Sequence, residues 1–370
     1  MNRKPRVVIA GLGDTGVLTA IQLARHADVV GISTKPGLVS GQELGLRLAR
    51  PHEWQRDYRI DFGRFHRLDA AQIIHGTITS VDTDERTVMV KAADGSTHEE
   101  PYDALVIATG AANGFWRTPA LQDDHDVARS LEESHGRIEA AASVMVIGGG
   151  AAAVSSAWNI AATWPDKQVD LYFPGDHALP HHHPRVWRTL RPRFEERGIG
   201  LHAGHRADIP AGFRCDEITR GPVAWSTGQP ESTADAVLWA IGQVRPNTDW
   251  IPPEFLDARG FVVVDDYLRV VGADRIYAVG DVAATDPLRT SARARADRLV
   301  ARNVRADLGH GTPKRFRPLR RRWGSVVGVQ GNRLEVFSPD GRSWTIPAWD
   351  ALWPWLVARS IYKGVRPRRD

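Results

Sequence analysis

Two glycine-rich stretches have the residue types and spacing that could hold the phosphates of a dinucleotide. The first reads GLGDTG at residues 11–16 and follows the apolar run VVIA at 7–10. The second reads GGGAAA at residues 148–153 and follows VMVI at 144–147. A glycine loop between a buried strand and a helix leaves backbone N–H groups free at the helix N-terminus, where they attract an anionic pyrophosphate. The sequence therefore predicts two dinucleotide sites.

The first loop matches the full GxGxxG pattern, and each glycine has its own expected task. Gly11 allows the tight turn, Gly13 lets the backbone approach the pyrophosphate, and Gly16 lets the helix pack closely on the strand. The acid that usually binds a ribose should end the next strand, but Ser33 stands there. A hydroxyl can still hydrogen-bond the ribose, although more weakly than a carboxylate would.

The second loop fits the GxGxxA variant, and the strand that follows it ends in Phe173. An acid at that position normally binds the free 2′-hydroxyl of NADH and would repel the 2′-phosphate of NADPH. Because Phe173 carries no charge and Arg185 and Arg188 follow it, we expect NADPH to serve at least as well as NADH. The alternative is a second glycine loop that is kept only for packing.

The composition narrows the class of protein. The chain has 370 residues, 42% of them hydrophobic and 25% charged, which is typical of a globular protein with two or three domains. It has no run of eighteen apolar residues, and its apolar N-terminal segment is too short for a signal peptide, so we expect a cytoplasmic protein. The one cysteine, Cys215, excludes a disulfide within the chain and is expected to be a structural thiol.

Three further motifs lie in order around the two glycine loops. They are YDALVIATGA at residues 102–111, ADAVLWAIGQVRPNT at 234–248 and DRIYAVGDVAA at 274–284. With the loops, they resemble the two-dinucleotide flavoprotein superfamily of pyridine nucleotide-disulfide oxidoreductases. Within it, the chain is most similar to ferroptosis suppressor protein-like and type II NADH dehydrogenase-like members.

The resemblance implies an α/β fold with two Rossmann-like dinucleotide-binding domains, the second inserted in the first. Residues 1–117 and 247–312 would form the FAD-binding domain, residues 118–246 the NAD(P)H-binding domain, and residues 313–370 a short C-terminal region. The residues between 73 and 107 alternate in polarity and contain Asp94-Gly95, which predicts a β-meander beside the first sheet.

The resemblance also implies two sets of cofactor-binding residues. The set for FAD is Gly11, Gly13, Asp14, Thr15, Gly16, Ser33, Arg47, Ile78, Ala108, Thr109, Gly110, Gly280 and Asp281. The set for NAD(P)H is Gly148, Gly150, Ala151, Ala152 and Gly242. No catalytic side chain is identified. A metal is not expected, because His181, His182 and His183 stand between prolines without a carboxylate or cysteine nearby.

The chain departs from its relatives at both ends of the expected electron path. The helix that carries the redox cysteine pair in disulfide reductases has no cysteine here. Ser155 and Asn159 stand where the NADH dehydrogenase branch has glutamates near the nicotinamide, and Arg293 and Arg295 interrupt the segment that lines the quinone site in that branch. The donor and acceptor sites are therefore expected to have diverged.

The most concrete function that follows is an FAD-dependent NAD(P)H oxidoreductase that passes a hydride through the flavin to a quinone-like small molecule. Two alternatives stay open. One is a reductase acting on a natural product or a protein partner, and the other is a flavin-binding interaction module with low turnover, which the missing acid at Ser155 favours. No nucleic-acid partner is expected, and a homodimer is compatible with the sequence.

The C-terminal region is basic and rich in tryptophan. From Lys314 to Asp370 it has thirteen Lys or Arg against four Asp or Glu, a net charge of +9. Its tryptophans are Trp323, Trp344, Trp349, Trp353 and Trp355. This composition suits a peripheral contact with the inner face of a membrane, where indole rings and basic groups meet lipid headgroups. The competing interpretation is that these tryptophans cover the flavin domain, with Pro354 breaking any helix.

Overall fold

The computed structural model describes residues 3–114, 117–285, 288 and 295–367. Its larger sheet has seven strands in the order β15-β8-β1-β2-β5-β6-β7. The strands are β1 (Arg6–Ala10), β2 (Asp28–Ser33), β5 (Gln72–Asp82), β6 (Thr87–Ala92), β7 (Thr97–Pro101), β8 (Ala104–Ile107) and β15 (Ile276–Ala278). From β15 to β5 the neighbours are parallel, and β1, β8 and β15 are almost wholly buried, which explains their continuous apolar sequences.

Strand β5 joins the parallel and antiparallel parts of this sheet. Its first residues pair in parallel with β2, and the residues from Gly76 onward pair antiparallel with β6. The expected meander is therefore an extension of the first sheet rather than a separate layer. Its hairpin turn has Gly95 at φ +87°, and the Asp94 carboxylate accepts a hydrogen bond from the backbone N–H of Ser96 at 2.9 Å, which is the turn that Asp-Gly predicts.

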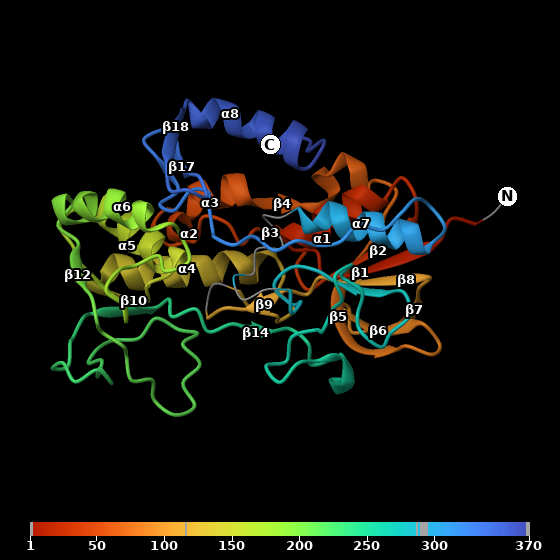
Figure 1. The fold of residues 1–370 in the computed structure, drawn as a ribbon, viewed down its shortest axis with the longest axis horizontal. Coiled ribbons are helices and arrows are strands. Elements are labelled where there is room, and N and C mark those ends of the chain that lie inside the picture. The colour runs from red at the N-terminus through yellow and green to blue at the C-terminus, as the bar shows by residue number, and fades with distance from the viewer. Residues whose placement is uncertain (1–2, 115–116, 286–287, 289–294, 368–370) are drawn as a thin grey trace.

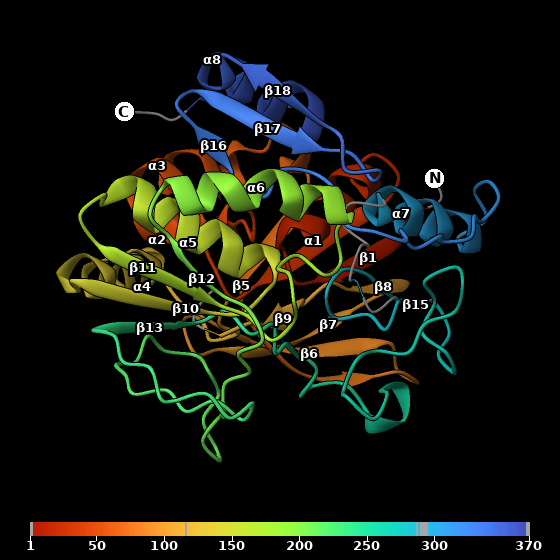
Figure 2. The ribbon, with the colours of Figure 1, turned by 60° about the vertical axis from the view of Figure 1, so that its left-hand side comes forward.

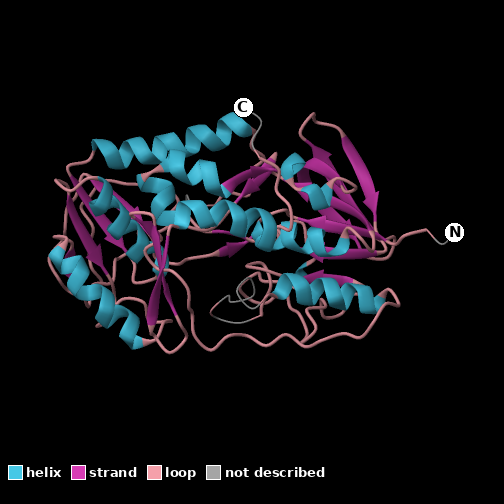
Figure 3. Ribbon diagram, turned by 90° about the horizontal axis from the view of Figure 1, so that it is seen from above, coloured by secondary structure: helices cyan, strands magenta, loops and turns pink. Residues whose placement is uncertain are grey.

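The smaller sheet has four parallel strands in the order β12-β11-β10-β13. They are β10 (Ser143–Ile147), β11 (Gln168–Tyr172), β12 (Gly200–His202) and β13 (Ala236–Trp239). Figure 2 shows α5 (Ala151–Thr163) and α6 (Pro184–Glu196) together on one side of this sheet, with irregular chain on the other. Each face has its own core: Phe194 is buried on the helical side and Trp225 on the other. Figure 3 shows most strands gathered toward two ends of the molecule, with helices between them.

Two short strands connect the sheets. The chain leaves the first sheet after β8 through β9 (Ala111–Ala112) and returns toward it through β14 (Arg245–Pro246), and these two strands pair antiparallel. Thr109 and Asn247 extend the connection, because the Thr109 hydroxyl donates to the Asn247 carbonyl at 2.9 Å and the Asn247 amide donates to the Thr109 carbonyl at 2.8 Å. Both passages are thereby fixed to each other beside the end of β8.

The remaining helices pack on or between the sheets. These are α1 (Asp14–Leu23), α2 (Leu44–Ala49), α3 (Pro51–Tyr58), α4 (Asp124–Ala140) and α7 (Ala296–Asp307), with a short hairpin of β3 (Gly37–Val39) and β4 (Arg59–Asp61) and single 3-10 turns at Phe62–Arg64, His66–Leu68 and Pro253–Phe255. The sequence RGFVVVDDYLRV at residues 259–270 predicts paired strands, but it forms only isolated bridges, such as Val264 with Val270.

The C-terminal region lies over both halves of the molecule, as the blue ribbon in Figure 1 shows. It contains β16 (Val329–Gln330), β17 (Arg333–Phe337), β18 (Ser343–Pro347), α8 (Trp349–Trp355) and a π-helical turn at Leu356–Ile361. Phe337 is buried in the core of the smaller sheet, whereas Tyr362 is buried in the core of the larger one. The region is therefore an integral part of the packing.

Candidate functional site

The first glycine loop has the geometry that its sequence predicts. Gly11 has φ +96°, and a Cβ at this position would come within 2.5 Å of the Ala108 carbonyl oxygen. A Cβ on Gly16 would overlap the Gly11 carbonyl, so only glycine allows helix α1 to approach the loop this closely. Gly13 differs from both, because a Cβ there meets no protein atom within 4 Å. Gly13 is thus open toward a ligand while its two neighbours in the motif support the backbone.

A cavity of about 490 Å³ opens beside this loop, a size typical of small-molecule sites. Twelve of the thirteen residues expected to contact FAD line it. They are Gly11, Gly13, Asp14, Thr15, Ser33, Arg47, Ile78, Ala108, Thr109, Gly110, Gly280 and Asp281. Gly16 does not line the cavity and acts in packing instead. Residues of β2 and β5 and of the turns after β1, β8 and β15 thus meet at the carboxyl ends of parallel strands, where such folds bind ligands.

Asp14 organises the segment that follows β3. Its carboxylate accepts hydrogen bonds from the Ser40 hydroxyl at 2.7 Å and the Gly41 backbone N–H at 2.8 Å. Burial, together with the negative charge of Asp14, raises the pKa of Tyr362 well above its usual value, and the Tyr362 hydroxyl hydrogen-bonds to Asp14. The glycine loop and the C-terminal segment are therefore joined through one carboxylate.

Lys35 lies in the cavity two residues after Ser33 and was missed by the sequence analysis. Its ammonium group donates to the Thr118 carbonyl at 3.2 Å and to the Ala120 carbonyl, while its backbone N–H donates to the Ser33 hydroxyl at 3.1 Å. Burial and the nearby positive charge of Arg47 lower the pKa of Lys35 to about 8. The sequence did offer a signal: Lys35 stands two residues after β2, the strand that ends in Ser33 and not in the usual acid.

Two arginines add positive charge to the cavity. The Arg47 guanidinium lies 5.0 Å from the centre of the Trp54 ring, and burial with the charge of Arg117 lowers its pKa to about 10. Arg117 was also missed, and its Nη1 lies 2.5 Å from an oxygen of Asp281. The lining also holds three aspartates, so the cavity has as many acidic as basic side chains and carries no net positive charge. The open face of Gly13, with Lys35 and Arg47 as cationic groups beside it, fits a cofactor that carries a pyrophosphate.

The second glycine loop is separate from this cavity. Gly148 has φ +139°, and a Cβ there would overlap the Ala240 carbonyl, whereas Gly150 and Gly242 have open space at theirs. Ala151 and Ala152, in the first turn of α5, are half-buried, and none of the five residues expected to contact NAD(P)H lines the first cavity. The open glycine and the first turn of α5 suit a pyrophosphate.

The segment after β11 packs onto the second loop. Phe173 is buried and meets the Trp187 ring edge-on at 5.7 Å, and the Leu179 backbone N–H donates to the Gly149 carbonyl at 2.6 Å. Arg185 and Arg188 are exposed on α6. The position of the usual ribose acid is thus taken by a core aromatic residue, and the two arginines stay available at the surface.

The two positions without glutamate are buried. A Cβ on Gly45 of α2 would overlap the Ser155 carbonyl, so α2 and α5 are in backbone contact. The Asn159 amide donates to the Ser155 carbonyl at 2.8 Å and to the Val327 carbonyl at 2.9 Å. Asn159 is thus held by hydrogen bonds to α5 itself and to the C-terminal region.

The other residues of interest lie outside the cavity. Cys215 is buried on the second face of the smaller sheet, and burial raises the pKa of its thiol. Arg295 is exposed at the start of α7, whereas Arg293 lies outside the described residues. In the described ranges, no three His, Cys, Asp or Glu side chains are placed to hold a metal ion. None of the helices there has both the length and the apolar character to cross a membrane.

Several known proteins are similar to this chain over most of its length. Ferroptosis suppressor protein 1 of Xenopus tropicalis is 25% identical over 336 residues, which cover 85% of this chain and 83% of the relative. The sulfide:quinone oxidoreductase of Aquifex aeolicus has a TM-score of 0.72 at 16% identity and matches 98% of this chain and 93% of its own. The NAD-dependent persulfide reductase of A. fulgidus has a TM-score of 0.68 at 20% identity, and the match covers 90% of this chain and 63% of that longer one.

The sequence model of one family spans most of the chain. It is described as pyridine nucleotide-disulphide oxidoreductase and matches residues 5–301, which include both glycine loops and all three further motifs. The cofactors of this family are FAD and NAD(P)H, in agreement with the resemblance found in the sequence. The chain therefore belongs to the pyridine nucleotide-disulphide oxidoreductase family and is a flavoprotein oxidoreductase dependent on a pyridine nucleotide.

Proposed function

We propose that the chain oxidises NAD(P)H and passes the electrons, through FAD, to a quinone-like small molecule. The observation that carries this proposal is the first cavity, which brings together twelve of the expected flavin-site residues without a cysteine among its lining. The only thiol of the chain, Cys215, is buried in a different core. A disulfide relay is therefore excluded, and electrons have to leave for an external acceptor. When bound, FAD accepts a hydride from the nicotinamide and releases the electrons to that acceptor.

The chain's own residues would bind and orient the two nucleotides. In this proposal Gly13 and the first turn of α1 receive the FAD pyrophosphate, Lys35 and Arg47 supply positive charge, and the Arg117–Asp281 pair holds the cavity wall. The first turn of α5, beside Gly150, receives the NAD(P)H pyrophosphate. We extend the proposal to the domains: 1–117 with 247–312 for FAD, 118–246 for NAD(P)H, and 313–370 as the C-terminal region.

The acceptor is tested by spectroscopy and turnover. The purified holoprotein is reduced anaerobically with NADH and with NADPH while the flavin absorbance is followed. It is then mixed with a short-chain ubiquinone, a ferredoxin or ferricyanide. We expect reoxidation by the quinone to be fastest among the physiological acceptors. Reoxidation by the ferredoxin alone would replace the quinone with a protein partner and would contradict the proposal.

The buried state of Ser155 and Asn159 favours a second candidate, a flavin-binding interaction module with low turnover. No carboxylate stands at these positions, and the Asn159 amide is held by the Ser155 and Val327 carbonyls. The same anaerobic experiment separates the two functions, because a module would leave its flavin oxidised in the presence of either nucleotide. Rapid bleaching of the flavin would exclude the module.

We also propose that the C-terminal region contacts the inner face of a membrane. Trp344 and Trp355 are about half exposed, at 49% and 52%, which supports such a contact, whereas Trp349 is buried and Trp353 packs on Tyr58 with ring centres 5.0 Å apart. The two exposed indoles and the basic groups around them would form the contact. This placement would keep the enzyme close to a quinone acceptor that is dissolved in the bilayer.

A further inference from the structure

A second cavity, of about 210 Å³, is lined mainly by basic side chains. It lies between α1 and α7, which pack side by side in the same core (Figure 1), and it shares no lining residue with the first cavity. Five arginines, one lysine and one histidine line it, and its other residues are Ile21, Gln22 and Ala301. None of the described residues that line it is acidic.

Three of the arginines form one stripe along α7. Arg298, Arg302 and Arg305 are spaced at i, i+4 and i+7, so they project from the same face of the helix. Like charges at this spacing destabilise a helix. Arg25, which follows the end of α1, and Arg67, in the 3-10 turn His66–Leu68, face them across the cavity. The fold thus concentrates repulsive charge in a concave place.

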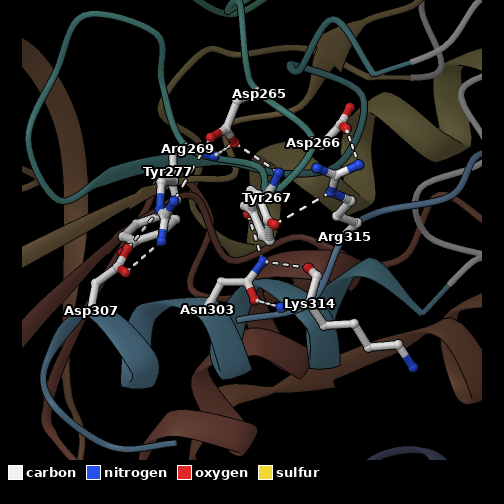
Figure 4. A network of polar contacts seen from close by, with 9 residues as sticks. All are labelled: Asp265, Asp266, Tyr267, Arg269, Tyr277, Asn303, Asp307, Lys314 and Arg315. Atoms are coloured by element: carbon white, nitrogen blue, oxygen red, sulfur yellow. Dashed lines mark hydrogen bonds and ion pairs between the residues drawn. The ribbon is translucent and has the colours of Figure 1, made fainter. Parts of the chain in front are cut away.

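The polar groups on the opposite face of α7 cannot neutralise this stripe. Figure 4 shows Asp307 bound to Arg269 and Tyr277, with 2.6 Å between the Asp307 carboxylate and an Arg269 nitrogen. In the same view Asn303 donates to the backbone carbonyls of Tyr267 and Lys314 at 2.7 and 3.0 Å. This network holds α7 from the side opposite the arginine stripe. Asp307, the last residue of α7, is already paired with Arg269.

In the described part of the chain the charges in the cavity have neutral hydrogen-bond partners or none, although the buried Asp297 of α7 interacts electrostatically with Arg298. Lys363 donates to the Gln22 side chain at 3.0 Å, and Arg302 donates to the Thr312 carbonyl at 2.8 Å. Arg25, Arg298 and Arg305 have no carboxylate within ion-pair distance there, and the buried Nε of Arg305 has no hydrogen-bond partner. Buried donors of this kind normally find an acceptor.

We propose that this pocket binds an oligophosphate, that is, a small anion with two or more phosphoryl groups. Guanidinium groups match phosphoryl oxygens in planar, charge-assisted pairs, and several of them in one pocket require several negative charges in a small volume. The cavity is too small for a nucleic-acid duplex or a folded protein, so the ligand is a free oligophosphate or the phosphorylated headgroup of a lipid. The inference does not depend on the proposed acceptor, because no electron passes through the pocket.

The experiment uses the FAD-loaded protein, so that the first cavity is filled. Pyrophosphate and tripolyphosphate are titrated by calorimetry at constant ionic strength. Sulfate, which has a single tetrahedral anionic group, is the control. A double variant, Arg25→Gln with Arg298→Gln, removes two exposed charges whose side chains make no hydrogen bond within the described ranges. Arg214→Gln is the matched control, because Arg214 is exposed and lies outside the pocket.

We expect tripolyphosphate to bind at least tenfold more tightly than sulfate, the double variant to lose at least tenfold in affinity, and Arg214→Gln to behave as the parent. Flavin content and the visible spectrum show that each variant is folded. Absence of binding by the parent, or equal affinity in the parent and the double variant, would overturn the proposal.

Vesicles distinguish the two sources of the ligand. Phosphatidylcholine vesicles containing a phosphoinositide are compared with vesicles containing phosphatidylserine at equal total charge. Binding that prefers the phosphoinositide and is lost in the double variant identifies a lipid headgroup, whereas free oligophosphate that binds without any vesicle preference identifies a soluble ligand. Equal binding to both vesicles, unchanged in the double variant and without affinity for free oligophosphate, would contradict the pocket in either form.

Discussion

Arg117 and Asp281 form an ion pair in the wall of the first cavity, with 2.5 Å between Nη1 and Oδ2. Arg117 precedes α4, and Asp281 belongs to the motif DRIYAVGDVAA and follows β15, so the pair joins segments 164 residues apart. Its side chains are about one third exposed, 37% for Arg117 and 28% for Asp281. The pair therefore connects the passage between the two sheets to a residue that is expected to contact FAD.

This pair predicts the effect of removing the acid. Asp281→Ala leaves the partly buried Arg117 without its partner, which should cost about 1–2 kcal/mol in the free energy of unfolding and weaken FAD retention. The matched variant Arg117→Met, combined with Asp281→Ala in a double-mutant cycle, should recover part of that loss. Chemical denaturation of the four proteins measures the coupling, and strict additivity would show that the two residues act independently.

Gly13 predicts a loss of cofactor without a loss of fold. A valine at this position meets no protein atom near its Cβ but occupies the space in which the pyrophosphate would lie, so Gly13→Val should purify folded and without flavin absorbance. Gly136→Ala in α4 is the control, because its Cβ is equally free and it does not line the cavity. Full flavin occupancy in the valine variant would refute the assignment of this loop.

Lys35 predicts a pH dependence. Its pKa of about 8 in the folded protein lies below its usual value near 10.5, so the unfolded chain holds more protons between these values, and this group adds stability to the cofactor-free protein as the pH rises through that window. The affinity for FAD should change in the opposite direction with pH, because the anionic pyrophosphate favours the protonated amine of Lys35. We expect FAD affinity to fall about tenfold above pH 8, and Lys35→Met to abolish that fall. Fluorescence titration with FAD between pH 7 and 9.5 measures the affinity of the parent and of Lys35→Met. The expected factor of about ten is the order of magnitude that one charge-assisted hydrogen bond contributes.

Phe173 and the arginines of α6 predict the nucleotide preference. Since Phe173 is buried and uncharged, NADPH should reduce the flavin at least as efficiently as NADH. Replacing both Arg185 and Arg188 by alanine should lower kcat/KM for NADPH by about tenfold and leave the value for NADH unchanged. A parent enzyme that prefers NADH more than tenfold, measured by stopped-flow reduction, would contradict this interpretation.

The exposed indoles predict the behaviour of the C-terminal region. Trp344→Ser with Trp355→Ser should reduce binding to anionic vesicles at low salt and leave the thermal midpoint nearly unchanged. Trp349→Ser is the contrasting variant and should lower the midpoint, because that ring is buried against Leu334 and Val336. Truncation before Trp344 is a poor test, since it also removes the buried Val357 and Tyr362. Equal vesicle binding by the double variant and the parent would disprove the contact.

The sequence alone was sufficient for the features that depend on local rules. The two glycine loops, the strands before them and the Asp94-Gly95 hairpin follow from backbone conformations that few residues other than glycine adopt readily. The order of the motifs predicted the family, which the match over residues 5–301 confirms. The resemblance to the family supplied the residues expected to contact FAD, and twelve of them line one cavity because parallel strands bring their carboxyl ends to one edge.

Only the tertiary structure decided the features that depend on long-range contacts. Lys35 and Arg117 have no motif of their own, and their place in the cavity follows from bonds to residues 85 and 164 positions away. The tryptophans of the C-terminal region look alike in sequence, yet packing buries Trp349 and exposes Trp355. The basic pocket likewise combines Arg25, Arg298 and Lys363, because α1, α7 and the chain end meet in space. The spacing of charges along the chain does not predict these contacts, because the packing of whole elements against a shared core determines them.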